Sequence, residues 1–172
     1  MGKRANKPKE KSIYRQALDK VTARLDGTGL PWPEKPKDYG LEYEFPSDIS
    51  GLSGGALGKL QGRLAGWEGY VSHLLALADI DLSLLQISYD VALGEKMLEL
   101  QTNGSKGKLK DVLKAEALAT VPELRRATFV LAEKRALVHA LKAQKGIYEM
   151  QRGAASREQS RRSDELRMSR HD

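Results

Sequence analysis

Residues 53–89 have the sequence SGGALGKLQGRLAGWEGYVSHLLALADIDLSLLQISY, and this stretch decides the fold. Apolar side chains recur in it at alternating spacings of three and four residues, the period of one face of an α-helix. After residue 78 the row resumes in a shifted register, which indicates one stutter. The stretch therefore predicts a long amphipathic helix over 53–100. The row consists of Leu57, Leu60, Leu64, Trp67, Val71, Leu74, Leu82, Leu85 and Tyr89.

A second amphipathic stretch spans 120–150, after the polar segment 103–108 (NGSKGK). The two glycines of that segment favour a tight connection, so we expect the two long helices to pair as an antiparallel hairpin. Residues 109–119 also have a helical pattern. Thr120, Pro122 and Glu123 then have the spacing of a capping box with Pro in the first turn, which predicts a new helix or a kink there.

The chain of 172 residues is 40% hydrophobic and only 6% aromatic, which predicts an all-α fold with one core. Around the hairpin we expect a short N-terminal helix, an extended Pro-rich strap and basic flexible termini. The strap carries four prolines; its aromatic side chains should lie over the helices of its own chain or of a neighbour, and a peptide-docking PxxP ligand is the alternative. The expected segments are a basic tail at 1–11, a short helix at 12–27, the strap at 28–50, the hairpin oligomerisation core at 51–152 and an Arg-rich tail at 153–172.

Glycines at positions 54, 58, 62 and 66 form a separate row at i, i+4 spacing near the start of the first long helix. Each costs about 1 kcal/mol relative to Ala inside a helix. Either another backbone approaches this row closely, or the section is frayed or kinked and firm helix begins only at Trp67. The first alternative predicts an interface between copies of the chain, formed by Gly58, Gly62, Gly66, Leu57, Leu64, Trp67, Val71, Leu85 and Tyr89.

The sequence indicates no catalytic site and no cofactor. It contains no Cys, its three His residues lack metal-ligand spacing, and the common nucleotide-binding and metalloprotease motifs are absent. His73, Asp79 and Asp81 interrupt the longest apolar region, so we expect no membrane span. The first residues lack the apolar stretch of a secretory signal, which favours the cytoplasm.

Charge is distributed by segment: residues 1–25 carry +6, residues 26–102 carry −7 and residues 103–172 carry +7. Basic ends of this kind can neutralise phosphates, so we expect salt-sensitive binding to DNA with little sequence selectivity. The alternative is that the ends only keep the chain soluble. The predicted phosphate contacts are Lys3, Arg4, Lys7, Lys9, Lys11, Arg157, Arg161, Arg162, Arg167 and Arg170.

This layout resembles the small terminase subunits of tailed phages. The resemblance rests on the basic opening (MGKR at 1–4, KPK at 7–9), on the helical hairpin, and on SREQ at 156–159 before an Arg-rich end. It implies a non-enzymatic ring in the host cytoplasm, or associated with the virion, that binds phage DNA and hands it to a large terminase subunit. The lack of a clear helix-turn-helix departs from the family and puts site-specific DNA reading in doubt.

Two other families remain open. The sequence WEGY at 67–70 and the basic second helix are similar to phage recombination mediators of the UvsY type, which bind single-stranded DNA. A structural virion protein such as a head-to-tail adaptor is the third alternative. In that case the ends would lie between neighbouring proteins and would not bind nucleic acid.

Overall fold

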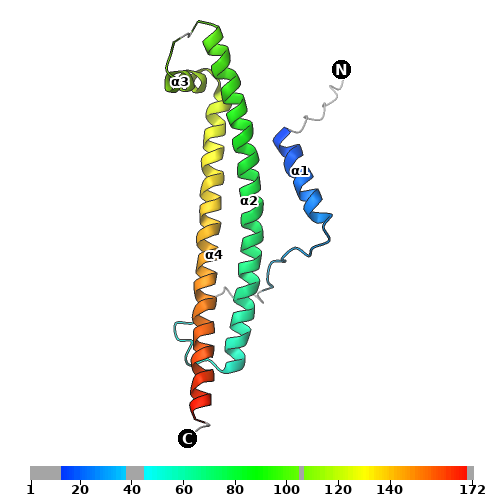
Figure 1. Cartoon of the computed structure of the whole chain (residues 1–172), viewed down its shortest axis with the longest axis vertical. Helices are drawn as coiled ribbons and strands as arrows, with labels where there is room; N and C mark the ends of the chain where they lie inside the picture. Colours follow the sequence, from blue (N-terminus) through cyan, green and yellow to red (C-terminus); the bar gives the residue numbers. More distant parts are fainter. Residues whose placement is uncertain (1–12, 38–44, 105–106, 170–172) are drawn as a thin grey trace, which may run out of the picture. The chain divides into compact units, whose positions relative to one another are not determined.

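The computed structural model describes residues 13–37, 45–104 and 107–169, and in these ranges the protein is all-α, as predicted. The helices are α1 (Ile13–Asp26), α2 (Gly54–Thr102), α3 (Lys110–Thr120) and α4 (Pro122–Met168), shown in Figure 1. Residues 1–11, the predicted basic tail, lie outside the described ranges. Short α1 and long α2 agree closely with the helices predicted at 12–27 and 53–100.

Residue contacts divide the chain into two compact units. One comprises residues 1–30 and 79–135 and is called here the α3 unit; the other comprises residues 31–78 and 136–172 and is called the strap unit. Helices α2 and α4 each contribute to both units. Within each unit the two helices pair antiparallel, which is the predicted hairpin arrangement.

In the strap unit, the first turns of α2 pack on the last turns of α4. The Ser53 hydroxyl accepts a hydrogen bond from the Ala56 backbone N–H at 3.1 Å, so it caps α2. Leu57, Leu60 and Leu64 then meet Ala155 of α4 in a buried cluster. The helix is formed from Gly54 onward, so the frayed alternative for its first section is wrong.

The described strap residues lie over the helices of their own unit. The Trp32 ring is tilted against the His73 ring with centroids 4.4 Å apart. Phe45, Ile49 and Leu52 pack on the leucine cluster that joins α2 to α4. The strap therefore adds apolar cover to a two-helix seam that is too narrow to bury its leucines alone.

In the α3 unit, α3 runs across the ends of α2 and α4 and closes the core there (Figure 1). Tyr89 and Leu93 of α2, Ala117 of α3, and Leu124 and Leu131 of α4 form the buried cluster. An ion pair between Lys134 Nζ and Asp81 Oδ2, 2.5 Å apart, fixes the antiparallel register of α2 and α4 within this unit. The connection before α3 uses Gly104 and Gly107 at positive φ, which favours glycine.

The predicted capping box between α3 and α4 is wrong. The Thr120 hydroxyl donates to the Glu116 carbonyl oxygen at 2.8 Å, so it bonds back to the end of α3 instead of capping α4. Val121, in an extended conformation, separates the two helices, and its carbonyl oxygen accepts the Arg125 N–H at 3.3 Å. A new helix does begin at Pro122, as expected from the position of the proline.

The Arg-rich tail predicted at 153–172 is also wrong for most of its length, because α4 continues to Met168. This extension is packed: Ala155 is fully buried and Glu158 is 9% exposed. The sequence pattern missed the extension because its one buried apolar residue is Ala155. Ala155 packs on Leu57, Leu60 and Leu64 of α2, about 90 residues away in sequence.

The residues predicted to join copies of the chain instead hold one chain together. Leu57, Leu64, Val71 and Tyr89 are buried within their units, and Leu85 packs on the α3-unit core. The Trp67 ring stacks on the Tyr148 ring of α4 with centroids 6.2 Å apart. These six apolar residues therefore form the seam of the hairpin, and the sequence could not tell an internal partner from an external one.

The predicted glycine row has no close backbone neighbour within the described ranges. A Cβ built at Gly58 or Gly62 would meet nothing within 4 Å, and one at Gly66 would meet only the Pro36 side chain at 3.4 Å. The close approach that would compensate for these glycines is thus not made by residues 13–37, 45–104 or 107–169. Their role in contacts between copies stays a prediction.

Removing buried volume from the seam should destabilise the hairpin. Leu64 is fully buried, so Leu64→Ala should lower the free energy of unfolding by about 2–5 kcal/mol. Leu166→Ala, at an exposed position of α4 in the same unit, is the matched control and should change it by less than about 0.5 kcal/mol. Urea denaturation at a fixed protein concentration measures the free energy of unfolding of both variants. An equal loss of this free energy in the two variants would contradict the packing described.

Candidate nucleic-acid interface

Four of the ten predicted phosphate contacts lie in the described ranges, all on the last four turns of α4. They are Arg157, Arg161, Arg162 and Arg167. The other six, Lys3, Arg4, Lys7, Lys9, Lys11 and Arg170, lie outside these ranges. The structure therefore bears only on the C-terminal half of the prediction.

Two of the four arginines are engaged by a buried carboxylate, that of Glu158. Arg161 donates from Nε and Nη2 to the two Glu158 oxygens, at 2.8 Å each, and Arg162 Nε donates to Glu158 Oε1 at 2.7 Å. Arg161 also pairs with Glu165. The fork of the Arg161 guanidinium is thus occupied on the helix itself, and Arg162 is held there through its Nε.

Arg162 further ties α4 to the segment that precedes α2. Its Nη1 donates to the Leu52 carbonyl oxygen at 2.6 Å, and its Nη2 donates to the Ser50 carbonyl oxygen at 2.8 Å and to that of Ile49 at 3.3 Å. These carbonyl groups lie in a turn and have no helical donor. Arg162 therefore has a structural role in this unit, and its contact with phosphate stays a prediction.

This arrangement changes the titration of the carboxylate. Hydrogen bonds from Arg161, and then from Arg162, stabilise the charged form and lower the pKa of Glu158 from 4.5 to about 2. The same pairing raises the pKa of the Arg161 guanidinium. Both groups are charged across the physiological range, and they neutralise each other.

Arg157 and Arg167 remain available. Both are exposed, and neither forms an ion pair with another residue of the described ranges. Arg167 lines a shallow groove of about 370 Å³ along α4 with Ser156, Gln159, Ser160, Ser163 and Asp164. Hydroxyl, amide and guanidinium donors are the groups that contact phosphate oxygens in protein–DNA complexes. The serine and glutamine positions were not predicted; their i, i+3, i+4, i+7 spacing on one helix face is the signal that could have found them.

Further unpaired cations lie on the outer surface of α3 and α4. Within the described ranges none of them takes part in an ion pair, and all are exposed: Lys110, Lys114, Arg125, Arg126 and Lys142. In contrast, two cations that face α2 are paired with carboxylates, Lys134 with Asp81 and Arg152 with Glu68 at 2.7 Å, and a third, Arg135, donates to the Gln86 side chain. Packing thus sorts the basic residues of α4 into an inner, neutralised set and an outer, available set.

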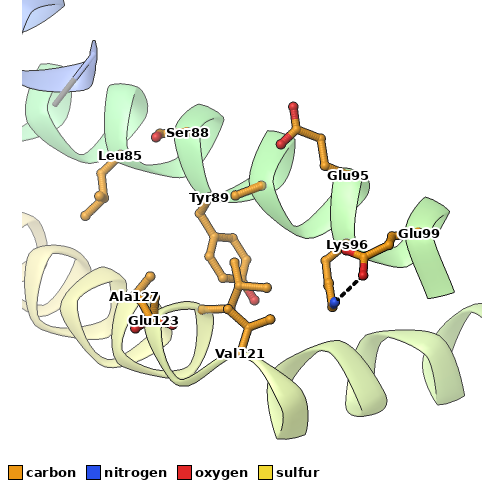
Figure 2. A pocket seen from close by; sticks show the side chains of 11 residues that line it. Leu85, Ser88, Tyr89, Glu95, Lys96, Glu99, Val121, Glu123 and Ala127 are labelled. Carbon is orange, nitrogen blue, oxygen red and sulfur yellow. Dashed lines mark hydrogen bonds and ion pairs between the residues drawn. The ribbon is translucent and has the colours of Figure 1, made fainter.

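A larger groove in the α3 unit has the opposite charge (Figure 2). It has a volume of about 440 Å³, with Leu85, Tyr89 and Leu124 as its apolar floor. Glu95, Glu99 and Glu123 line its rim, and the one cation there, Lys96, is paired with Glu99 at 2.8 Å. A phosphate group would be repelled from this groove.

Neither groove holds a recognisable catalytic arrangement. Among the described residues no cluster of three or more His, Cys, Asp or Glu side chains could hold a metal ion. His73 lies against Trp32, and its buried Nδ1 has no hydrogen-bond partner in the described structure.

In length and composition alone α2 would qualify as a membrane-crossing helix, a weak criterion that core helices of soluble proteins also meet.

The Glu158 pairing predicts a pH-dependent stability. Because the pKa of Glu158 is lowered on folding, the pairing stabilises the fold fully above about pH 4.5, and this stabilisation is lost as the pH falls towards 2. Glu158→Gln should therefore lower the melting temperature most near neutral pH, and the gap to the unmodified chain should narrow in acid. Asp164→Asn, at an exposed position of the same helix, is the control. If the difference in melting temperature between Glu158→Gln and the unmodified chain does not vary with pH, the role of this pairing is contradicted.

Comparison with known proteins adds no family to this description. No protein-family model, curated protein or solved structure matches the chain. The function must therefore be argued from the hairpin itself and from the cations that its packing leaves unpaired.

Proposed function

We propose that this chain is a non-enzymatic DNA-binding protein that works as a homo-oligomer, of the kind represented by the small terminase subunits of phages. In that role it binds viral DNA in the host cytoplasm and recruits a large packaging subunit. The observation that carries the proposal is the sorting of cations on α4. Carboxylates neutralise the inner cations, whereas Arg125, Arg126, Lys142, Arg157 and Arg167 stay exposed without an ion pair in the described ranges.

Such a surface suits the DNA backbone better than the bases. The available cations are spread along a helix of 47 residues, about 70 Å long, and do not converge on one base-sized site. Each neutralised phosphate releases counterions, so affinity would fall steeply with salt. A single chain offers few such contacts, and assembly of several copies on one DNA would multiply them.

The packing of Trp67 weakens the case for single-stranded DNA. Proteins that hold single strands stack bases on exposed aromatic rings. Trp67, the ring that suggested a recombination mediator, packs on Tyr148 and lies edge-on to Tyr70 at 6.1 Å. Because these rings are engaged within the chain, the packaging role is the better supported of the two.

The test is a gel-shift series with duplex and single-stranded DNA at two salt concentrations. We expect duplex binding that weakens with salt. The double variant Arg157→Ala/Arg167→Ala should bind more weakly and should reduce the slope of log affinity against log salt by roughly 2, about one per lost phosphate contact.

The matched control is Lys96→Ala/Lys145→Ala. It removes the same charge, but from cations already paired with Glu99 and Glu149 on their own helices, so it should leave the slope nearly unchanged. An equal loss of DNA affinity in both double variants would show a nonspecific charge effect. Preference for single strands would favour a recombination mediator, and no binding at low salt would favour a structural virion protein; either result would overturn the proposal.

A further inference from the structure

Helix α2 is apolar on two opposite faces in the α3 unit. One face, with Tyr89 and Leu93, packs on α4. The other carries Ile87, Val91 and Leu98, whose side chains are 61%, 56% and 65% exposed. At 3.6 residues per turn, Val91 points about 200° away from Tyr89, so the exposed row lies opposite the packed one.

The exposed row has the spacing of a helix-packing surface. Its members are four and seven residues apart, and Ile80 and Leu84, both half-buried, extend the same row towards the N-terminus of α2. The row is then about 27 Å long. A single exposed Leu needs no explanation, but a continuous apolar row at helical spacing is typical of a surface that another helix covers.

The outer face of α4 offers a complementary surface in the same unit. Phe129 is 67% exposed and Val130 is 39% exposed. Phe129 lies two residues from buried Leu131, so its side chain points about 200° away from the seam. Exposed Arg125 and Arg126 flank it one turn earlier.

The charges beside the two outer faces are opposite. The α2 row is flanked by exposed Asp90 and Glu95. The α4 surface has Arg125 and Arg126, with Glu133 one turn beyond Phe129. Packing one α2 row on another would bring acidic flanks together, whereas packing it on an α4 outer face would pair acids with cations.

The antiparallel register aligns these groups. Within the α3 unit, Asp81 pairs with Lys134, and Arg135 donates a hydrogen bond to Gln86. Counting along both helices from these two pairs places Val91 level with residues 124–130, a range that includes Phe129. It places Glu95 level with residues 120–126, a range that includes Arg125 and Arg126. Copies placed side by side around an axis parallel to the helices would keep these levels.

We infer that the outer face of α2 in one copy packs on the outer face of α4 in the next copy. The occupant of the exposed row is thus a second copy of this chain, in a head-to-tail contact that closes into a ring or continues as a filament. The contact supplies the assembly on which the proposed function rests. In this contact Arg125 and Arg126 would pair with acidic residues of the next copy. Lys142, Arg157 and Arg167 would then remain available for DNA.

The absence of cysteine from the chain makes the contact testable by disulfide cross-linking of purified protein without DNA. Chains carrying Val91→Cys and chains carrying Phe129→Cys, co-expressed and mildly oxidised, should give a cross-linked dimer. Either variant alone should give none, and the double variant should give a ladder of larger species. Val91→Cys co-expressed with Met150→Cys, an exposed α4 position at another level, is the control and should not cross-link.

Two outcomes would overturn the inference. Dimers from Val91→Cys alone would mean that two α2 rows meet around a two-fold axis. A cross-link within one chain between Val91→Cys and Leu18→Cys would mean that α1 covers the row. As a second measurement, Val91→Glu should keep its helical circular dichroism and reduce the mass in light scattering to that of the 19.0 kDa monomer. Because no DNA is present, failure here is separable from failure of DNA binding.

Discussion

The structure depends on one contact, the burial of the apolar row of α2 against α4. In each unit the pair of helices forms a narrow seam of leucines with few aromatic side chains. Two helices alone leave much of such a seam in contact with water, so each unit adds a cover: α3 in one and the strap in the other. The exposed outer surfaces of both long helices are a direct consequence, because the covers close only the seam.

Electrostatic pairing follows from that packing and decides which cations remain available. Basic residues of α4 that face α2 meet carboxylates, as in the Lys134–Asp81 and Arg152–Glu68 pairs. Near the end of α4, Glu158 holds Arg161 and Arg162, and Arg162 in turn satisfies the carbonyl groups before α2. Arginine thus has a structural role at position 162. Arg157 and Arg167, each five residues away from it, are available for phosphate.

In the proposed function, an outer surface that is apolar, acidic on α2 and basic on α4 would link assembly to DNA binding. A protein that binds DNA through scattered cations needs several copies on one duplex, because each contact is weak and screened by salt. A head-to-tail contact gives every copy the same environment and presents the remaining cations of α4 in a repeated array. Assembly and DNA binding would then depend on different residues of the same helix.

The sequence by itself determined α1, α2 and α3 and the start of α4. Alternating three- and four-residue spacing, the stutter after Ala78, Pro122 in a first turn and the polar segment 103–108 are local signals, and local signals fix secondary structure. Only the tertiary structure decided which partner covers the apolar row of α2. The spacing of the apolar side chains is the same whether the partner helix belongs to the same chain or to another copy. It likewise decided that α4 extends to Met168 and that Arg162 is structural, since both depend on residues 49–52, about 110 positions away along the chain.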